Sequence, residues 1–439
     1  MAYLDGTAIN VALPTLQREL GVGMEGMQWT LDAYLLTLSA FVLLGGSLGD
    51  LFGQRRTFVL GVAWFALASA ACGCVTSALG LVVARAIQGV GAAILVPGSL
   101  ATLRTNIDAE DQGAAIGTWA GLGAVTTAVG PLFGGWLVQA ISWRAVFFLN
   151  LPLAGVALWA GLRYLPASAG RGGVRLDVAG ASAAALGIGG VTYALIEGPA
   201  RAWPPTAVVA AAVGVTALVA FIPLERRPDA MLPLSLFRSR AFAATNLTTL
   251  ALYAGLGSAI FLLALVLQQA LGYSPLAAGA ALLPVTLLLL LFSPSAGRLA
   301  QRFGARLPLT LGPVLVAVGF FLFLRVRQHA GYLDSVLPGV LAFAVGLAVT
   351  VAPLTGAVLS AVDSSFAGIA SGVNNAVARL AGLLGVAAVP WAAGLTGHSG
   401  NLPPEALLLG FHRAMGLCGV LAIAGGVVAA WGLRAEGGR

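Results

Sequence analysis

Long apolar runs separated by short polar connections follow one another along the whole chain. Most of them extend for about 18 to 25 residues, and an α-helix of about 20 residues crosses the ~30 Å hydrocarbon core of a bilayer at ~1.5 Å per residue. A β-barrel would instead show ~10-residue segments in which apolar and polar residues alternate. The pattern therefore predicts an all-α integral membrane protein with fourteen spans, near residues 1–17, 27–49, 57–77, 79–103, 112–138, 144–165, 177–197, 203–223, 241–270, 275–297, 307–325, 335–360, 366–396 and 412–433.

The composition supports a membrane protein. Hydrophobic residues make up 59% of the 439 positions and charged residues 9%, whereas a soluble domain is about 25% charged. All 23 basic residues are arginine, so the chain lacks the lysine-containing phosphate-binding loop of ATP-driven proteins. We expect a monomer in the lipid bilayer that is not an enzyme, uses no cofactor and binds no nucleic acid. Any energy for its activity must come from a gradient or from another subunit.

The arginines indicate the side on which each loop lies. An even number of spans puts both termini on one side, where the loops and the C-terminus carry fifteen arginines against six in the opposite loops. Because basic residues concentrate in cytoplasmic loops, both termini are predicted to be cytoplasmic.

The all-arginine, Ala- and Gly-rich composition suggests a GC-rich bacterial genome, and so a bacterial inner membrane. The first apolar run ends early, at Arg18, so we expect a truncated first helix and a longer form of the protein, or poor insertion of this form.

One turn occurs twice in the chain. Residues 46–55 read GSLGDLFGQR and residues 297–306 read GRLAQRFGAR, and five of the ten aligned positions are identical. Such repeats are expected of transporters built from duplicated bundles that rock about a central site. The chain is therefore predicted to contain an N-terminal six-helix bundle at 1–165, two extra helices with their linkers at 166–240 and a C-terminal six-helix bundle at 241–439.

The repeated turn resembles the G-x-L-a-D-r-x-G-r-[KR] signature of the major facilitator superfamily. Three more segments are similar to motifs of its fourteen-span drug:proton antiporters, the branch of the QacA and EmrB exporters: LDGTAINVALP at 4–14, RAIQGVGAA at 85–93 and GPLFGG at 130–135. The resemblance implies the major facilitator fold and export of small organic molecules in exchange for protons. The chain departs from these motifs at Leu51, Gln54, Thr126 and Gln301.

Ionisable side chains inside a span are costly, so each is a candidate functional group. Asp5 lies 13 residues before Arg18, hence ~20 Å below the outer boundary at ~1.5 Å per residue. A carboxyl group there could load and release a proton, and the resemblance assigns the corresponding acid this role. Asp32 and Arg85 are further candidates for proton coupling. They lie about five and six residues into their spans from the outside, hence at similar depths, so Arg85 is predicted either to pair with Asp32 or to act on Asp5. Structural ion pairs are the alternative for all three residues.

Polar and aromatic side chains within the spans are candidates for substrate contacts. Gln88 lies three residues after Arg85 on the same helix face, and Asn375 and Arg379 share a face of their span. Aromatic side chains could line an apolar cavity, or simply pack in the core or face lipid. The predicted substrate-cavity residues are Asn10, Tyr34, Gln88, Trp119, Tyr253, Asn375 and Arg379.

Other residues are predicted to act in conformational change. Gly130 and Gly134 form a G-x-x-x-G face that permits close helix packing, and Pro131 bends the span. Asp50 is expected to cap a neighbouring helix or to pair with a nearby arginine as a latch. The full set comprises Gly46, Asp50, Gly53, Arg55, Arg56, Gly130, Pro131, Gly134 and Gly135. No metal site is predicted, and His329, His398 and His412 fall in predicted outer loops.

These features together predict a proton-coupled antiporter that exports drugs or other small amphipathic molecules by alternating access. Two alternatives remain. The same fold could serve a proton-coupled uptake permease for a small nutrient, or the chain could be a membrane sensor or assembly subunit that transports nothing.

Overall fold

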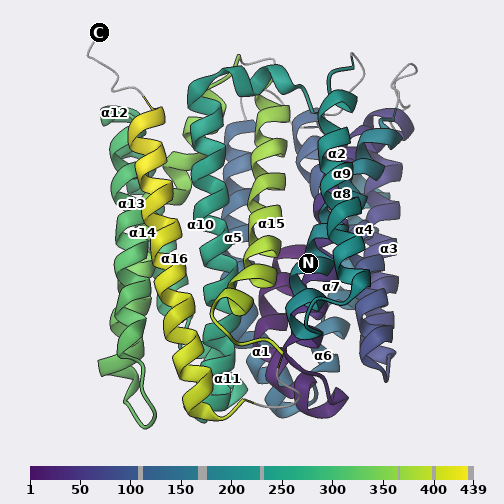
Figure 1. Ribbon diagram of the computed structural model, residues 1–439. Helices are drawn as coiled ribbons and strands as arrows, with labels where there is room; N and C mark the ends of the chain where they lie inside the picture. The colour runs from purple at the N-terminus through teal and green to yellow at the C-terminus, as the bar shows by residue number, and fades with distance from the viewer. Residues whose placement is uncertain (107–111, 167–175, 228–231, 364–365, 398–401, 434–439) are drawn as a thin grey trace. The chain divides into compact units, whose positions relative to one another are not determined.

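The computed structural model describes residues 1–106, 112–166, 176–227, 232–363, 366–397 and 402–433. Every regular element in these ranges is a helix (Figure 1). The helices form two compact units, which we call the N-terminal unit, Met1–Pro233, and the C-terminal unit, Leu234–Arg439. The predicted division into 1–165, 166–240 and 241–439 stays a prediction.

The N-terminal unit contains nine of the described helices. They are α1 (Ala2–Leu20), α2 (Met24–Phe52), α3 (Gln54–Cys74), α4 (Ala78–Asn106), α5 (Gln112–Ala140), α6 (Arg144–Phe148), α7 (Asn150–Tyr164), α8 (Val178–Ala200) and α9 (Pro205–Leu224). Within this unit α2 packs against α4 and α8, α3 packs against α4 and α7, and α1 packs against α5.

The described C-terminal unit consists of longer helices interrupted by short turns of a different pitch. Its elements are η1 (Leu234–Arg238), α10 (Arg240–Leu265), η2 (Val266–Ala270), α11 (Pro275–Ala280), α12 (Leu283–Phe303), α13 (Arg306–Leu322), η3 (Phe323–Arg325), η4 (Tyr332–Val336), α14 (Leu337–Ser360), α15 (Ala367–Ala392) and α16 (Pro404–Gly432). Here α10 packs against α15 and α16, and α13 packs against α14 and α16.

Eleven helical segments of the described chain are long and apolar enough to cross a membrane. The chain is therefore a multi-pass, all-helical membrane protein. The other three expected spans coincide with α1, α2 and α5, which are not among the eleven, so the number fourteen is not established.

Proline or a small polar residue begins several helices. Pro205, Pro275 and Pro404 lie in the first turns of their helices, where the backbone N–H that proline lacks would have no partner within the helix. The side chain of Ser239 caps α10.

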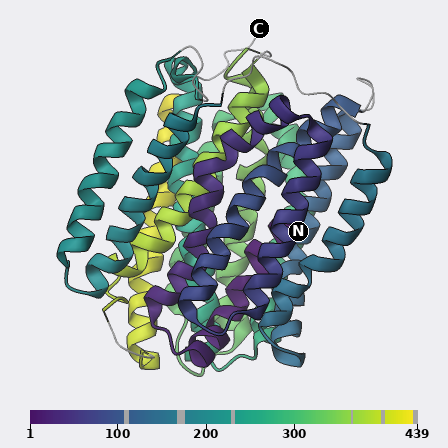
Figure 2. The same ribbon diagram turned by 90° about the vertical axis from the view of Figure 1, so that its right-hand side faces the viewer.

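Helices α8 and α9 run side by side as a hairpin (Figures 1 and 2). Glycines bring them close together, because a Cβ atom built at Gly190 would lie 2.5 Å from the carbonyl oxygen of Ala210. The hairpin attaches to the rest of the N-terminal unit through α8, which packs on α2. The two extra helices predicted from the sequence therefore form one hairpin of the N-terminal unit.

The repeated turn has the same backbone geometry in both units. Gly53 follows α2 with φ 91° and Gly304 follows α12 with φ 81°, a region that residues with a Cβ rarely adopt. The arginine at the end of each repeat then donates to a helix carbonyl: Arg55 Nη2 to Leu162 at 2.6 Å and Arg306 Nε to Ala430 at 2.9 Å. The sequence repeat therefore corresponds to a repeated structural turn.

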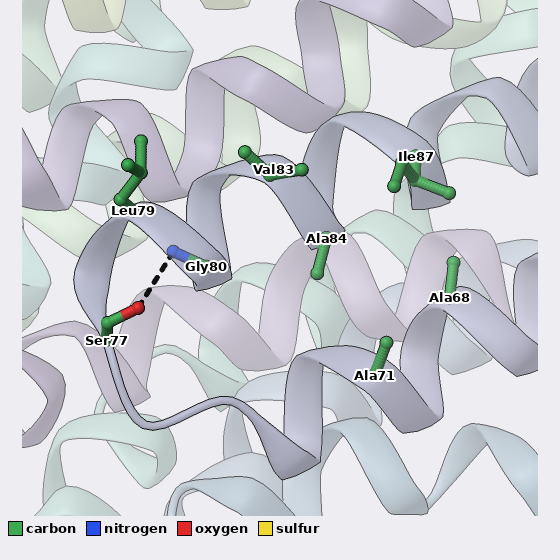
Figure 3. Close-up of a pocket in the computed structure, with 8 residues that line it drawn as sticks. All are labelled: Ala68, Ala71, Ser77, Leu79, Gly80, Val83, Ala84 and Ile87. Carbon is green, nitrogen blue, oxygen red and sulfur yellow. Dashed lines mark hydrogen bonds between the residues drawn. The ribbon is translucent and has the colours of Figure 1, made fainter.

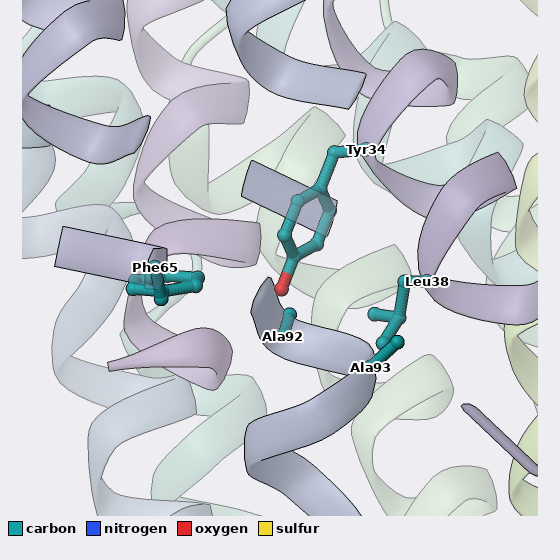
Figure 4. Packing of buried hydrophobic residues seen from close by; sticks show 5 residues of the cluster. All are labelled: Tyr34, Leu38, Phe65, Ala92 and Ala93. Atoms are coloured by element: carbon teal, nitrogen blue, oxygen red, sulfur yellow. The ribbon is translucent and has the colours of Figure 1, made fainter. Parts of the chain in front are cut away.

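Small residues let α2, α3 and α4 pack closely around aromatic side chains. One core cluster contains Tyr34, Leu38, Phe65, Ala92 and Ala93, each at most 2% exposed (Figure 4). On the outside of α3 and α4 a hollow of about 440 Å³ is lined almost entirely by apolar side chains (Figure 3). None of the residues that line this hollow is ionisable.

Candidate functional site

The carboxylate of Asp5 lies at the centre of a buried polar cluster in the N-terminal unit. Asp5 is 1% exposed. Its Oδ2 accepts from Arg85 Nη1 at 2.5 Å, and its Oδ1 accepts from Gln88 Nε2 and from Asn150 Nδ2, both at 3.0 Å. Helices α1, α4 and α7 are therefore joined through one carboxylate.

A second layer of hydrogen bonds holds these donors in place. Arg85 Nε donates to the carbonyl oxygen of Thr30 at 3.0 Å, and Arg85 Nη1 also donates to Gln88 Oε1 at 2.7 Å. Asn150 Nδ2 donates to Ser69 Oγ at 3.1 Å, and Ser69 donates in turn to the carbonyl oxygen of Phe147 at 2.8 Å. We call Asp5, Ser69, Arg85, Gln88 and Asn150 the Asp5 cluster.

Aromatic rings cover the guanidinium group of Arg85. Its Cζ lies 4.3 Å from the centroid of the Tyr34 ring and 5.8 Å from that of Phe147. Arg85 is 1% exposed. A buried ion pair offsets its desolvation only when further hydrogen bonds satisfy both partners, and the Asp5 cluster provides those bonds. The same arrangement means that any change in the charge of Asp5 acts directly on α4 and α7.

The sequence predicted part of this cluster. Asp5, Arg85 and Gln88 do meet, and Arg85 pairs with Asp5. The other predicted pairing, between Arg85 and Asp32, is wrong, because the guanidinium is engaged by Asp5 and Tyr34. Asn150 and Ser69 were missed. The signal for Asn150 was a lone amide inside an apolar span, where a polar side chain needs a partner.

Two other predicted polar residues of the N-terminal unit lie outside the Asp5 cluster. Asn10 Nδ2 donates to the carbonyl oxygen of Gly6, one turn back on its own helix, at 3.1 Å. Asp32 is 0% exposed, and neither of its carboxyl oxygens has a hydrogen-bond partner among the described residues.

Tyr34 is 2% exposed and belongs to the core cluster of Figure 4, which favours the packing interpretation of this side chain. The side chain of Trp119 lies outside the described residues.

The predicted conformational residues of α5 contact α1. A Cβ atom built at Gly134 would lie 2.8 Å from Cβ of Ala8, and one built at Gly130 would collide with Oγ1 of Thr7. Pro131 lies inside α5 between these two glycines. The predicted close packing of the G-x-x-x-G face is therefore confirmed. Asp50 lies in the last turn of α2, but its side chain is outside the described residues, so its pairing stays a prediction.

In the C-terminal unit the polar contacts involve Asn374 rather than the predicted Asn375. Asn374 Nδ2 donates to Asn246 Oδ1 at 3.1 Å and to Thr249 Oγ1 at 2.7 Å, which joins α15 to α10. Asn375 is exposed and donates to the carbonyl oxygen of Ser371 on its own helix. Arg379 is half-buried, and its Nε has no hydrogen-bond partner in the described chain.

Two further predictions concern an aromatic residue and the histidines. Tyr253 is half-buried and packs against a core cluster that includes Leu309 and Leu354. The prediction that His412 lies in a loop is wrong. It lies in α16, which begins eight residues earlier, at Pro404, and its Nε2 is 2.8 Å from the carbonyl oxygen of Val326. His398 lies outside the described residues.

A bundle of membrane-crossing helices with a buried acid–arginine cluster defines a polytopic membrane protein that holds charge within the bilayer, as ion and solute transporters do. The family model described as Major Facilitator Superfamily matches residues 1–386. The chain therefore belongs to the Major Facilitator Superfamily, and it is a transporter rather than an enzyme.

Several curated relatives cover most of the chain. "Multidrug resistance protein Stp" of Mycobacterium tuberculosis is 33% identical over 88% of this chain and 72% of its own length. "Tetracenomycin C resistance and export protein" of Streptomyces glaucescens is 34% identical over the same shares, 88% and 72%. "Methylenomycin A resistance protein" of Streptomyces coelicolor is 32% identical over 99% of this chain and 90% of its own length.

Solved structures share the fold at low sequence identity. The structure described as "Crystal structure of peptide transporter POT in complex with sulfate" superposes with a TM-score of 0.69 at 15% identity, and covers 97% of this chain and 91% of that chain. At this identity the likeness concerns the fold alone.

Proposed function

We propose that this protein is a proton-coupled antiporter that exports drugs or other small amphipathic organic molecules by alternating access. Three relatives with 32–34% identity are named for resistance to, or export of, such compounds. In this proposal the chain is a monomer in a bacterial inner membrane, crosses it fourteen times with both termini in the cytoplasm, and uses the proton motive force without a cofactor. The excess of arginine in the loops on one side supports the orientation.

The observation that carries the proposal is the Asp5 cluster. One carboxylate, 1% exposed, accepts hydrogen bonds from Arg85, Gln88 and Asn150. Protonation would neutralise that carboxylate, so the three donors on α4 and α7 would lose their common charged acceptor together. Proton binding at Asp5 would thereby loosen the contacts of α1 with both helices. Such a change in contacts between helices is what a proton must cause if it is to drive alternating access.

The test is substrate-driven proton movement in proteoliposomes, with a panel of lipophilic cations, dyes and antibiotics. We expect wild type to release protons when substrate is added. We expect Asp5→Asn to bind substrate without this proton release. Asp363→Asn is the matched control, because Asp363 is exposed and lies in the connection between α14 and α15. Substrate transport by wild type with no proton movement would contradict the proposal.

A further inference from the structure

Arg379 lies in the middle of a membrane-crossing helix of the C-terminal unit. It comes twelve residues after Ala367, where α15 begins, and thirteen before Ala392, where α15 ends. At ~1.5 Å per residue it is therefore ~18–20 Å from either end of the helix. A charged side chain at this depth is costly, and such residues face the interior of a bundle or a water-filled cavity, where they meet a partner. Arg379 therefore needs a counter-charge or water.

The described part of the C-terminal unit offers Arg379 no counter-charge. The described acidic residues of this unit are Asp334, Asp363 and Glu405, which lie in η4, after the end of α14 and in the first turn of α16. None of the ion pairs among the described residues involves Arg379. Its Nε is buried and has no hydrogen-bond partner in the described chain, so one N–H of the guanidinium is left to bind another molecule.

Helix α15 packs on α10 with a face that does not contain Arg379 (Figure 1). Asn374 donates to two side chains of α10, and a Cβ atom built at Gly385 would collide with the carbonyl oxygen of Ala254 of α10. Each helix residue turns ~100° from the last, so Arg379, five residues after Asn374, points about 140° away from it. The contact with α10 therefore leaves the guanidinium free.

The polar face of α15, formed by Asn375, Arg379 and Gly382, is open. Asn375 is exposed, Arg379 is half-buried, and a Cβ atom built at Gly382 would meet no atom within 4 Å. The three positions lie within ~60° of one another around the helix. Four and seven residues beyond Arg379, Leu383 and Val386 are 0% and 2% exposed. The open part of the face therefore ends about one turn beyond Arg379.

The composition of this face does not suit contact with lipid. The exposed face of α16 near its middle carries Leu417, Val420 and Ile423, all of them apolar, as expected of a helix that faces hydrocarbon. On α15 an exposed amide and an arginine lie at the same distance from the helix ends, where lipid tails would leave both groups unsatisfied. The polar face of α15 therefore lines a space that admits water.

We propose that Arg379 binds an anionic group of the transported molecule, a carboxylate on an amphipathic body. A guanidinium donates in parallel from Nε and one Nη to the two oxygens of a carboxylate, and the unpartnered Nε of Arg379 suits this arrangement. Asn375, one turn away on the same face, offers an amide to a further polar group. The inference rests on the proposed export of small amphipathic molecules and names a class of substrate for it.

Two dyes with the same ring system test the site by fluorescence anisotropy of the purified protein in detergent, where no gradient exists. Fluorescein carries a carboxylate, whereas rhodamine 123 is a cation whose carboxyl group is esterified. We expect Arg379→Gln to bind fluorescein about tenfold more weakly than wild type, or worse, because a charge-assisted hydrogen bond is lost. Rhodamine 123 binding is not expected to fall. Arg298→Gln, at an exposed arginine of α12, is the control and is expected to bind both dyes as wild type does.

Cysteine labelling tests the open face in a second way, and it leaves Arg379 in place. In a background without the three native cysteines, Asn375→Cys is expected to react with a water-soluble methanethiosulfonate, because the reactive thiolate forms only where water reaches it. Fluorescein is expected to slow this reaction. Val420→Cys, at an exposed apolar position of α16, is the control and is expected not to react.

The outcomes separate the anion site from the proposed function. Failure of wild type to bind fluorescein, or equal affinity in wild type and Arg379→Gln, overturns the site. If Arg379→Gln fails to fold, an unreactive Asn375→Cys, or one that fluorescein does not protect, overturns it as well. Slower labelling in liposomes of phosphatidylglycerol than of phosphatidylcholine, without any effect of fluorescein, assigns the site to a lipid headgroup instead. Fluorescein transport without proton movement contradicts the proposed antiport but supports the anion site.

Discussion

At the scale of single residues, the guanidinium group of Arg85 holds the buried polar groups of the N-terminal unit together. It binds Asp5, Gln88 and the carbonyl oxygen of Thr30, and it lies against the ring of Tyr34. Removing one partner of a buried ion pair leaves an uncompensated charge, which is strongly destabilising. Arg85 therefore matters for stability as well as for any coupling role.

We predict that Arg85→Ala destabilises the protein by about 3 kcal/mol or more, because the Asp5 carboxylate stays buried without its counter-charge. Arg85→Lys keeps the charge but not the planar fork of donors, so its loss is expected to be smaller. Thermal unfolding of the purified protein in detergent measures both effects. Arg298→Ala is the control, because Arg298 is exposed on α12. Equal unfolding temperatures for Arg85→Ala and Arg298→Ala would contradict the prediction.

At the scale of elements, two carboxyl groups lie at the end of the α8–α9 hairpin where α8 begins and α9 ends. Asp177 caps α8 through the N–H of Gly180 at 2.8 Å, and Glu225 follows α9 and accepts from the N–H of Leu232 at 2.7 Å. Oxygens of both acids lie within 2.4 Å of a Cβ atom built at Gly180. Burial raises the pKa of Glu225 from its ordinary value of 4.5 to about 7, and the charge of Asp177 adds to this.

The raised pKa of Glu225 predicts a definite pH dependence. Between pH 4.5 and about 7 the folded protein retains a proton at Glu225 that the unfolded chain has lost, so stability falls as the pH rises through this window and levels off above it. We expect Glu225→Gln to remove this part of the slope in unfolding temperatures measured from pH 4.5 to 8. Glu405→Gln, at an exposed position on α16, is expected to retain it. A wild-type slope in Glu225→Gln would show that another group is responsible.

At the scale of the whole molecule, the two units use the same turn. Gly53 and Gly304 both adopt a positive φ, and Arg55 and Arg306 both donate to the carbonyl of a helix end. A turn duplicated after α2 and after α12 fits the proposed topology, in which both turns face the cytoplasm. The topology can be tested independently of transport, by labelling single cysteines from one side of the membrane.

In a background without Cys72, Cys74 and Cys418, we predict that Arg201→Cys and Arg327→Cys react with an impermeant maleimide from outside the cell. Arg163→Cys and Arg298→Cys are expected to react only after the membrane is opened. All four arginines are exposed, so differences in reactivity report sidedness. Labelling of Arg163→Cys and Arg201→Cys from the same side would mean that α8 does not cross the membrane.

The depth of a residue in the membrane could be predicted from the sequence, but its partner in another helix could not. The depth of Asp5, Asp32 and Arg85 in their spans follows from counting residues along a helix of known rise. The partner of Arg85 does not, because it depends on which faces of α1, α2 and α4 meet. Depth favoured Asp32, because Asp32 and Arg85 were predicted at similar depths and Asp5 deeper in the membrane. The packing of Thr30 and Tyr34 against α4 turns Asp32 away, and leaves Arg85 to Asp5.

The sequence by itself determined the membrane class, the helices and the repeated turn, because apolar runs, arginine placement and glycine positions are local properties of the chain. It also predicted that the Gly130–Gly134 face packs closely. Only the tertiary structure decided that Ser69 and Asn150 complete the site at Asp5, and that Asp5 rather than Asp32 pairs with Arg85. These contacts join helices far apart in the chain, and they depend on the rotation of each helix about its own axis, which hydrophobicity alone leaves open in a chain that is apolar on nearly every face.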